Sequence, residues 1–317
     1  MLKPKPFGRA AKQKNQDSIV IPTSALENAM INARLIGKSI SLLLSAFFNI
    51  LVFMNTRALE IDLPVNSSPT FANPPVVETA LSVQSSGILW STLDFGTYFE
   101  TIKERFPSAS ESHCLPPIIE TFPTTIVDSK LVLSETIQPS RWLFSDPPNS
   151  SLLQVQSNRF GFNWRRVEGE EYPRFQNNCE VFKTEYENFQ SFCEERNLGS
   201  PEPQFSEVVY VNHIYPDDGE ELIDLFEKAF KGIDFSMCPK PELATFNRTF
   251  VIGDNDGRLY AEAGILPNDK IRFKLTSRAR CTDGNWGSSL KMAYDVLIEH
   301  FMELTEPTMH TEPWSLR

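Results

Sequence analysis

The sequence predicts an α+β fold in which a mainly antiparallel sheet has its helices packed on one face. Two observations point to this class. Segments in which polar and apolar residues alternate recur along the chain, which is typical of half-buried strands. Between them lie amphipathic segments, the longest at 172–197, whose apolar residues are three or four positions apart, as in a helix with one buried side. Helices that bury such a side against a sheet leave the other face of the sheet displayed.

The predicted elements fall into two halves with the same order of strand, helix, three strands and helix. The first half, 74–200, has strands at 76–83, 141–144, 152–156 and 159–166 and helices at 92–106 and 172–197. The second half, 201–317, has strands at 206–214, 244–252, 258–265 and 270–281 and helices at 219–231 and 288–304. This order predicts a duplication whose half-sheets join edge to edge, although residue identity between the halves is weak. A TATA-binding-protein-like fold and a helix-grip-like fold both satisfy it.

Residues 1–53 are predicted to be an N-terminal extension outside this fold, and residues 54–73 a linker. Within the extension, residues 39–54 form an uncharged, mostly apolar run that follows a basic segment and is shorter than a typical spanning helix. Three interpretations compete: a membrane anchor, a helix that docks on the protein or on a partner, and a translation start placed too early. We favour the last, with Met54 as the start, because a linker of ordinary length then leads to the first strand.

Charge and cysteine content narrow the choice of partners. The 317-residue chain has a net charge of −11, so it repels nucleic acid and anionic membranes unless a focused basic patch meets them. Its five cysteines are scattered, without a CxxC pair or a cysteine–histidine metal spacing. We therefore expect reduced thiols in the cytoplasm, no metal site and no cofactor.

The segment 270–280 carries the strongest functional signal. Cationic and mostly apolar or small residues alternate along it, so a strand would direct its charges to one face and Ile271, Phe273 and Leu275 into the core. The charged residues of this face are Lys270, Arg272, Lys274, Arg278 and Arg280. Alternation on the other strands adds Gln154, Gln156, Arg159, Asn163, Arg165 and Arg258.

These side chains form the predicted ligand-binding set. Guanidinium groups suit carboxylates and phosphates in bidentate geometry, and amide groups can read base edges. The competing interpretation is a solvated sheet face on which glutamates and arginines pair across strands without any ligand.

Several motifs resemble those of one protein family. They are Pro74-Pro-Val-Val-Glu78, Leu153-Gln-Val-Gln156, Arg159-Phe160, Asn163-Trp-Arg165, Tyr172-Pro-Arg-Phe175 and Glu306-Pro-Thr-Met-His310 with Trp314. Over about 74–314 the chain resembles a sporadically distributed bacterial family without an established activity, so the resemblance implies no catalytic residue. Members of that family typically begin just before the PPVVE segment, which implies that residues 1–53 lie outside it. Its patchy distribution resembles that of mobile or phage-defence genes.

The amino-acid sequence identifies no catalytic residue. The histidines, His113, His213, His300 and His310, lie in no HExxH, GxSxG or cysteine–histidine signature. We therefore favour a non-enzymatic binding, sensor or accessory protein that holds a nucleotide or nucleic acid on its open cationic face, in bacterial defence or regulation.

Two other function classes stay open. One is an enzyme for a phosphorylated or nucleic-acid substrate, which would use acids such as Glu78, Glu120 and Glu262 near Arg159 and Arg165. The other is a protein-interaction partner without a small ligand. Carboxylates that converge with the arginines in a closed cavity would favour catalysis, whereas a broad open face would favour binding.

Overall fold

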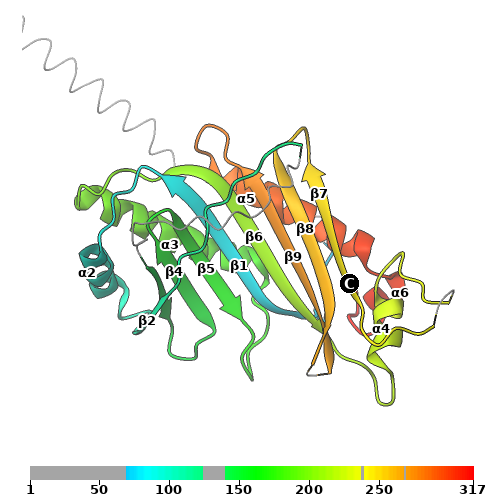
Figure 1. Cartoon of the computed structure of the whole chain (residues 1–317). Helices are drawn as coiled ribbons and strands as arrows, with labels where there is room; N and C mark the ends of the chain where they lie inside the picture. The colour runs from blue at the N-terminus through cyan, green and yellow to red at the C-terminus, as the bar shows by residue number, and fades with distance from the viewer. Residues whose placement is uncertain (1–68, 124–139, 237–238, 268) are drawn as a thin grey trace, which may run out of the picture. The chain divides into compact units, whose positions relative to one another are not determined.

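An antiparallel sheet is the frame of this protein (Figure 1). The computed structural model describes residues 69–123, 140–236, 239–267 and 269–317, and these residues form nine strands in the order β2-β3-β4-β5-β1-β6-β9-β8-β7. The strands are β1 (Val76–Ser86), β2 (Ser108–Ser112), β3 (Arg141–Ser145), β4 (Ser151–Gln156), β5 (Arg159–Arg165), β6 (Glu202–Ile214), β7 (Thr245–Ile252), β8 (Gly257–Leu266) and β9 (Lys270–Arg280). The helices are α2 (Thr92–Ile102), α3 (Arg174–Glu195), α4 (Leu222–Ala229), α5 (Trp286–Leu304) and α6 (Pro307–Thr311).

The two predicted halves meet at the centre of the sheet. There β1 pairs with β6 over most of its length, from Val76 opposite Asn212 to Ser86 opposite Glu202. On one side of this pair the strands continue outward as β5, β4 and β3, and on the other side as β9, β8 and β7. The strand β2 adds a further edge beside β3.

The α+β class is confirmed, because one antiparallel sheet carries helices packed against it. The order predicted for the first half was wrong in one respect, since β2 lies between α2 and β3, so that four strands instead of three follow α2. Its sequence, SASES, has no large apolar residue to alternate with polar ones, and its side chains are mostly exposed. Such an edge strand is held mainly by backbone pairing with β3, so hydrophobic periodicity does not reveal it. The short helix α6 was missed as well.

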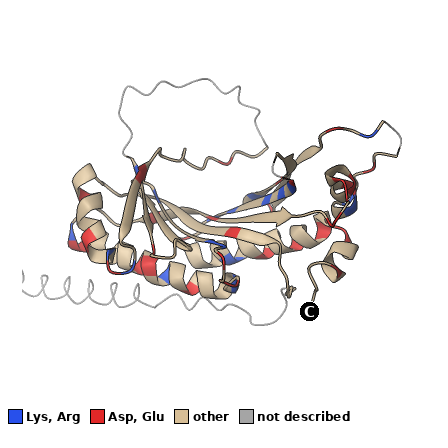
Figure 2. Ribbon diagram, turned by 90° about the horizontal axis from the view of Figure 1, so that it is seen from below, with Lys and Arg blue, Asp and Glu red and all other residues tan. Residues whose placement is uncertain are grey.

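The helices lie along one face of the sheet, where the core is aromatic (Figure 2). The α3 ring of Phe189 lies 4.8 Å from that of Phe160 on β5, centroid to centroid. On α5, Phe301 stacks on Phe273 of β9 at 5.9 Å. Because alternate residues of each strand point to this side, the predicted apolar faces of β5 and β9 are buried here.

The ends of the described chain pack against α5. Phe71 pairs with Leu316 in an isolated β-bridge, and its ring meets those of Phe301 and Trp314 at about 6 Å. The arm that contains Phe71, residues 69–76, therefore runs beside the helices before it enters β1. This position matters for the cavity described below.

The predictions for the N-terminal region fall outside the described residues. They concern the extension 1–53, its apolar run 39–54, the start at Met54 and most of the linker 54–73. All described residues belong to one compact unit, Ile61–Arg317. Within them, none of the helices combines the length and the apolar character needed to cross a membrane.

The helix-facing side of β5 can be tested at Trp164, which is 3% exposed. We expect Trp164→Ala to lower the free energy of unfolding by about 3–5 kcal/mol, because a large buried side chain leaves a cavity. Urea denaturation followed by circular dichroism measures the change. Leu93→Ala is the control, since Leu93 is 83% exposed and its loss should stay within about 0.5 kcal/mol. A loss below about 1 kcal/mol for Trp164→Ala would show that this side chain is not a core residue.

Candidate functional site

The predicted cations of both halves lie on the sheet face opposite the helices. The register places Gln84 opposite Arg159, and Glu207 opposite Arg278. Arg278 in turn lies opposite Arg258 on β8. Since directly opposed residues on neighbouring strands point to the same side, strands from both halves supply this face.

A segment of the chain itself crosses this face. Residues 114–122, which follow β2 and are called the crossing segment below, run over the sheet toward β8 (Figure 1). Gln156 binds both main-chain groups of Leu115, accepting from its N–H at 3.0 Å and donating to its carbonyl at 3.1 Å. Gln84 binds the N–H and the carbonyl of Ile118 in the same way. Two side-chain amides thus replace the backbone partner that a neighbouring strand would provide.

The crossing segment delivers one carboxylate to the arginines. Glu120 has a fully buried side chain, and Arg258 and Arg278 donate to its two oxygens, Arg278 at 3.1 Å. The hydroxyl of Tyr260 lies 2.9 Å from both oxygens. Arg258 also donates to the carbonyl of Thr121 at 2.8 Å. The predicted ligand arginines therefore already hold an anionic group, and it belongs to the same chain.

A second carboxylate extends this ionic network to the first half of the sheet. Glu207 on β6 accepts from the Nε of Arg278 at 2.6 Å and lies 3.7 Å from the Nη1 of Arg159. Arg159 also donates to the carbonyl of Pro116 in the crossing segment at 3.1 Å. The network thus runs from β8 across β9 and β6 to β5, and it holds three guanidinium groups and two carboxylates.

Burial and the nearby carboxylates shift the pKa values of the two arginines in opposite directions. Burial lowers the pKa of Arg278, but the carboxylates of Glu207 and Glu120 outweigh it, so the pKa lies above the ordinary value of arginine. Burial lowers the pKa of Arg159, and Glu207 opposes that shift. Burial, together with Glu120, raises the pKa of Tyr260, which keeps its hydroxyl protonated as a donor at neutral pH.

A close approach between β8 and β9 sets the spacing of the two central arginines. A Cβ at position 257 would lie 2.0 Å from the carbonyl oxygen of Arg278, so only glycine fits there. Gly257 is followed directly by Arg258, which therefore sits against β9 opposite Arg278. Gly257 thus begins β8 and positions an arginine of the network.

The side-chain amides of Gln154 and Asn163, which were predicted to bind a ligand, are hydrogen-bonded to other side chains of the sheet. Gln154 donates to Asn163 and accepts from Arg141 at 2.7 Å, while Asn163 donates to Glu78 at 2.9 Å. These bonds link β3, β4, β5 and β1 into one polar row. The amides of this part of the face are therefore occupied by other side chains of the sheet.

The remaining cations lie at the surface. Arg165 binds the main-chain and side-chain oxygens of Asn149, and Lys274 lies 3.9 Å from Glu262. Arg280 lies over the ring of Phe205 at 5.2 Å, and Lys270 over that of Tyr215 at 5.8 Å. The surface cations of the predicted set are Arg165, Lys270, Arg272, Lys274 and Arg280. Those on β9, Lys270, Arg272, Lys274 and Arg280, form a row of positive charge.

One histidine accompanies this row. His213 on β6 lies opposite Arg272, and its ring meets that of Tyr215 edge to face at 6.2 Å. Burial lowers the pKa of His213, and the charges of Lys270 and Arg272 lower it further. The imidazole is therefore neutral at physiological pH and offers one donor and one acceptor.

The carboxylates considered for catalysis are kept apart by their partners. Glu120 is enclosed by the arginines, Glu78 accepts from Asn163, and Glu262 lies beside Lys274 near the surface. Glu120 does converge with arginines, yet its side chain has no exposed surface on which a substrate could react. No group of three or more potential metal-ligating side chains occurs among the residues that the structure describes.

Sequence reasoning missed the internal partners of the predicted set. Glu207 and Gln84 belong to the same alternating faces of β6 and β1, so periodicity could have placed both on the open side. The path of the crossing segment is harder to foresee. Its prolines, Pro116 and Pro117, signal an extended stretch outside regular strands, but they do not say where that stretch lies.

Comparison with known proteins gives no further guidance: no protein-family model matches the chain, and no curated protein matches it either. The geometry of the described residues is therefore the basis for the functional argument below.

The ionic network predicts that removing the charge of Glu120 strongly lowers the stability of the fold. Glu120→Gln keeps the shape of the side chain but leaves Arg258 and Arg278 without their shared carboxylate. We expect a loss of about 3–5 kcal/mol in the free energy of unfolding, because the buried charge of Arg258 would lose the carboxylate that compensates it, while Arg278 would keep only Glu207. Urea denaturation measures this loss.

Glu262→Gln is the matched control, since it removes the same charge from a partly exposed pair at 3.9 Å. It should cost less than about 1 kcal/mol. Equal losses in the two variants would contradict a structural role of the Glu120 network.

Proposed function

We propose that this protein is a non-enzymatic binding or accessory protein that holds a single-stranded nucleic acid along β9. The observation that carries the proposal is the row of surface cations formed by Lys270, Arg272, Lys274 and Arg280, called the β9 row below. Within the described residues, the only ion pair of this row is the long contact of Lys274 with Glu262. The buried carboxylates instead engage Arg159, Arg258 and Arg278.

The spacing of the row favours a polyanion over a single phosphate. Side chains on one face of a strand are about 6.8 Å apart, so the row extends over about 34 Å. A mononucleotide could contact two of these charges, whereas a strand of nucleic acid carries phosphates along the whole row. Because the net charge is −11, the rest of the molecule repels a polyanion, and its attraction depends on this local row.

Aromatic rings beside the row add a second property of single-strand binding sites. Tyr215 is 59% exposed next to Lys270, and its neighbour His213 is neutral at physiological pH. Bases stack on exposed rings irrespective of their sequence, and a basic groove follows the backbone. We therefore expect binding that depends strongly on salt and weakly on base sequence.

The proposal also concerns the evolutionary origin of the fold and the cellular role of the protein. The matching strand orders on either side of the β1–β6 pair support a duplication. We favour the TATA-binding-protein-like alternative, because the half-sheets join at their first strands and the closing helices α3 and α5 cover the same face. The resemblance to a sporadically distributed bacterial family supports a cytoplasmic role in defence or regulation.

The β9 row can be tested by removing three charges. We expect the triple variant Lys270→Gln, Arg272→Gln, Lys274→Gln to bind a fluorescein-labelled oligothymidylate more weakly than the unchanged protein. The slope of log affinity against log salt should become shallower by about 2, because each lost phosphate contact on a single strand removes about 0.7. Fluorescence anisotropy at several salt concentrations measures both quantities.

The control removes the same charge elsewhere, in the variant Lys103→Gln, Arg196→Gln, Lys240→Gln. These residues are exposed or pair with exposed carboxylates away from the open face. Its affinity and salt slope should match those of the unchanged protein. Two results would refute the proposal. One is that the unsubstituted protein does not bind oligothymidylate at low salt. The other is that the salt slope of the control becomes as shallow as that of the triple variant.

A further inference from the structure

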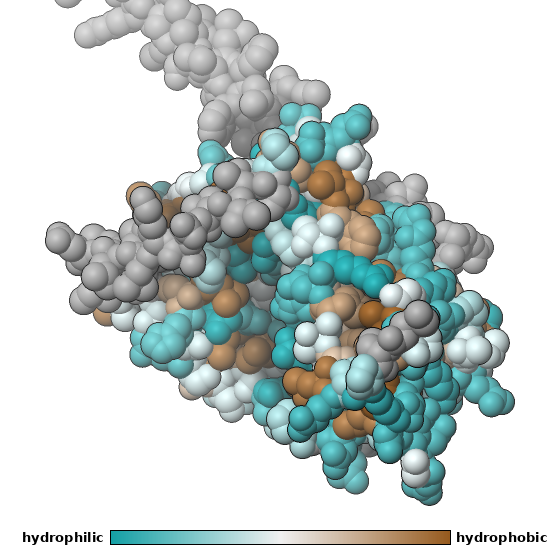
Figure 3. Space-filling model, turned by 45° about the vertical axis from the view of Figure 1, so that its right-hand side comes forward, coloured by the Kyte–Doolittle hydropathy of each residue, from teal (hydrophilic) through white to brown (hydrophobic). Residues whose placement is uncertain are grey.

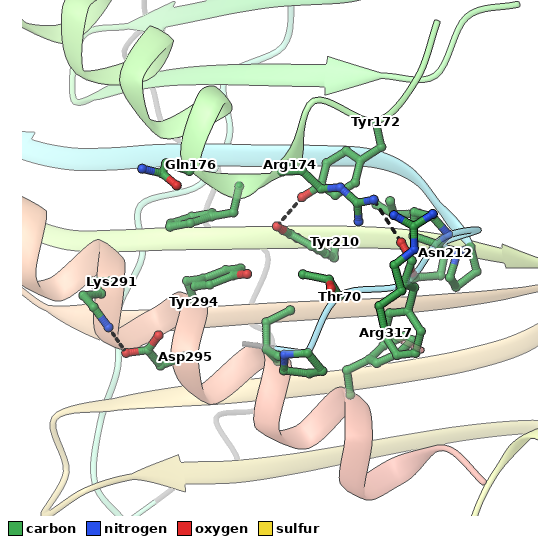
Figure 4. A pocket seen from close by; sticks show the side chains of 18 residues that line it. Thr70, Tyr172, Arg174, Gln176, Tyr210, Asn212, Lys291, Tyr294, Asp295 and Arg317 are labelled. Atoms are coloured by element: carbon green, nitrogen blue, oxygen red, sulfur yellow. Dashed lines mark hydrogen bonds and ion pairs between the residues drawn. The ribbon is translucent and has the colours of Figure 1, made fainter. Parts of the chain in front are cut away.

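A cavity of about 440 Å³ lies on the helix side of the sheet, away from the β9 row (Figure 4). The arm at residues 69–76, the start of α3, the strand β6 and the helix α5 enclose it. Its volume is within the range of sites that bind small molecules. Figure 3, which shows another side of the molecule, presents hydrophobic residues in separate areas bordered by hydrophilic ones.

Aromatic rings form the walls of the cavity. Phe175 of α3 and Tyr294 of α5 stack almost in parallel, with centroids 3.7 Å apart. Tyr210 of β6 lies on the sheet side, and Tyr172, which precedes α3, is its neighbour, with ring centroids 6.3 Å apart. Flat rings on several sides favour a flat, apolar ligand group.

Two hydroxyl groups meet inside these walls. The oxygens of Tyr172 and Tyr210 are 2.6 Å apart, so one hydroxyl donates to the other. Burial raises the pKa of both tyrosines, and both remain protonated at neutral pH. One hydrogen bond uses one of the two phenolic protons, and the second proton remains to be donated to an acceptor on a ligand.

The rim of the cavity is positively charged. Arg174 donates to the carbonyl of Phe71 at 2.9 Å, and Arg317 is held beside it by a bond from its N–H to Thr70 at 2.8 Å. Lys291 is paired with Asp295, so the guanidinium groups of Arg174 and Arg317 set the sign of the charge. Both arginine residues are exposed.

The backbone at Arg174 adds an independent sign of constraint. Its φ is +73°, in the left-handed region that side-chain-bearing residues rarely adopt. In this conformation Arg174 begins α3 while its side chain is bonded to the arm. Packing of the arm and of Tyr172 therefore fixes one guanidinium at the rim.

From these contacts we propose that the cavity binds a small aromatic anion. The ring system of the ligand lies among Tyr172, Tyr210 and Tyr294, and its carboxylate, sulfonate or phosphate group faces Arg174 and Arg317. The free proton of the tyrosine pair is donated to an oxygen of the ligand. This site is separate from the β9 row, which lies on the other face of the sheet.

The test uses two fluorescent probes of nearly equal shape and the full chain. One is 8-anilinonaphthalene-1-sulfonate, and the other is N-phenyl-1-naphthylamine, which has the same rings without the sulfonate. We expect the sulfonate probe to bind at one site, and the double variant Arg174→Gln, Arg317→Gln to weaken it about tenfold, since a charge-assisted contact is lost. Binding of the neutral probe should change less than twofold.

Two further variants locate the probe. Tyr210→Phe removes a hydroxyl but keeps the ring, so we expect the sulfonate probe to bind several-fold more weakly. The control Lys103→Gln, Arg196→Gln removes the same charge as the arginine pair from exposed positions outside the cavity and should leave both probes unchanged. Thermal unfolding by circular dichroism establishes that each variant is folded before it is titrated.

Three outcomes would overturn the proposal. The first is that the sulfonate probe does not bind the unchanged protein. The second is that the folded arginine variant weakens both probes equally, which would mean that the rim does not select an anion. The third is that the control weakens the sulfonate probe as much as the arginine variant, which would place that probe elsewhere.

Discussion

The antiparallel pairing of β1 with β6 is the contact on which the rest of this structure depends. It joins the two half-sheets at their first strands, so β5 on one side and β9 on the other become near neighbours. Only because of this pairing can Glu207 contact both Arg159 and Arg278, which come from different halves of the chain. The same junction brings Tyr210 of β6 beneath helices from both halves. Both candidate sites therefore include residues of the central strands or their neighbours.

One sheet carries two different chemistries because its side chains alternate in direction. The face under the helices is aromatic, and burial keeps its phenols Tyr172 and Tyr210 neutral. The opposite face is ionic, and the chain offsets much of its charge with its own carboxylates. Buried ion pairs contribute little net stability compared with apolar packing, but an unpaired buried charge is costly. The ionic network thus acts mainly to fix where the crossing segment lies.

Much of the sheet could be predicted from the sequence, because half-buried strands and amphipathic helices leave periodic patterns. The alternation in 270–280 placed Ile271, Phe273 and Leu275 in the core, and all three are buried. The partners of those residues could not be predicted in the same way. Glu120 lies 138 positions before Arg258, and nothing in local periodicity connects the two. The cavity was missed for a similar reason, since Tyr172, Tyr210 and Tyr294 come from separate elements and each resembles an ordinary core residue.

The manner in which Gln84 and Gln156 hold the crossing segment has a consequence for how this protein can evolve. Within the crossing segment their amides bind main-chain groups of Leu115 and Ile118, so most replacements at those two positions preserve the bonds, proline being the exception because it lacks an N–H. Ile119, between two anchored positions, is 74% exposed. Two glutamines and one glutamate therefore hold the segment in its path, while its outward side chains are free to diversify. A lineage can change the chemistry that this face presents to its surroundings without altering a single strand of the sheet.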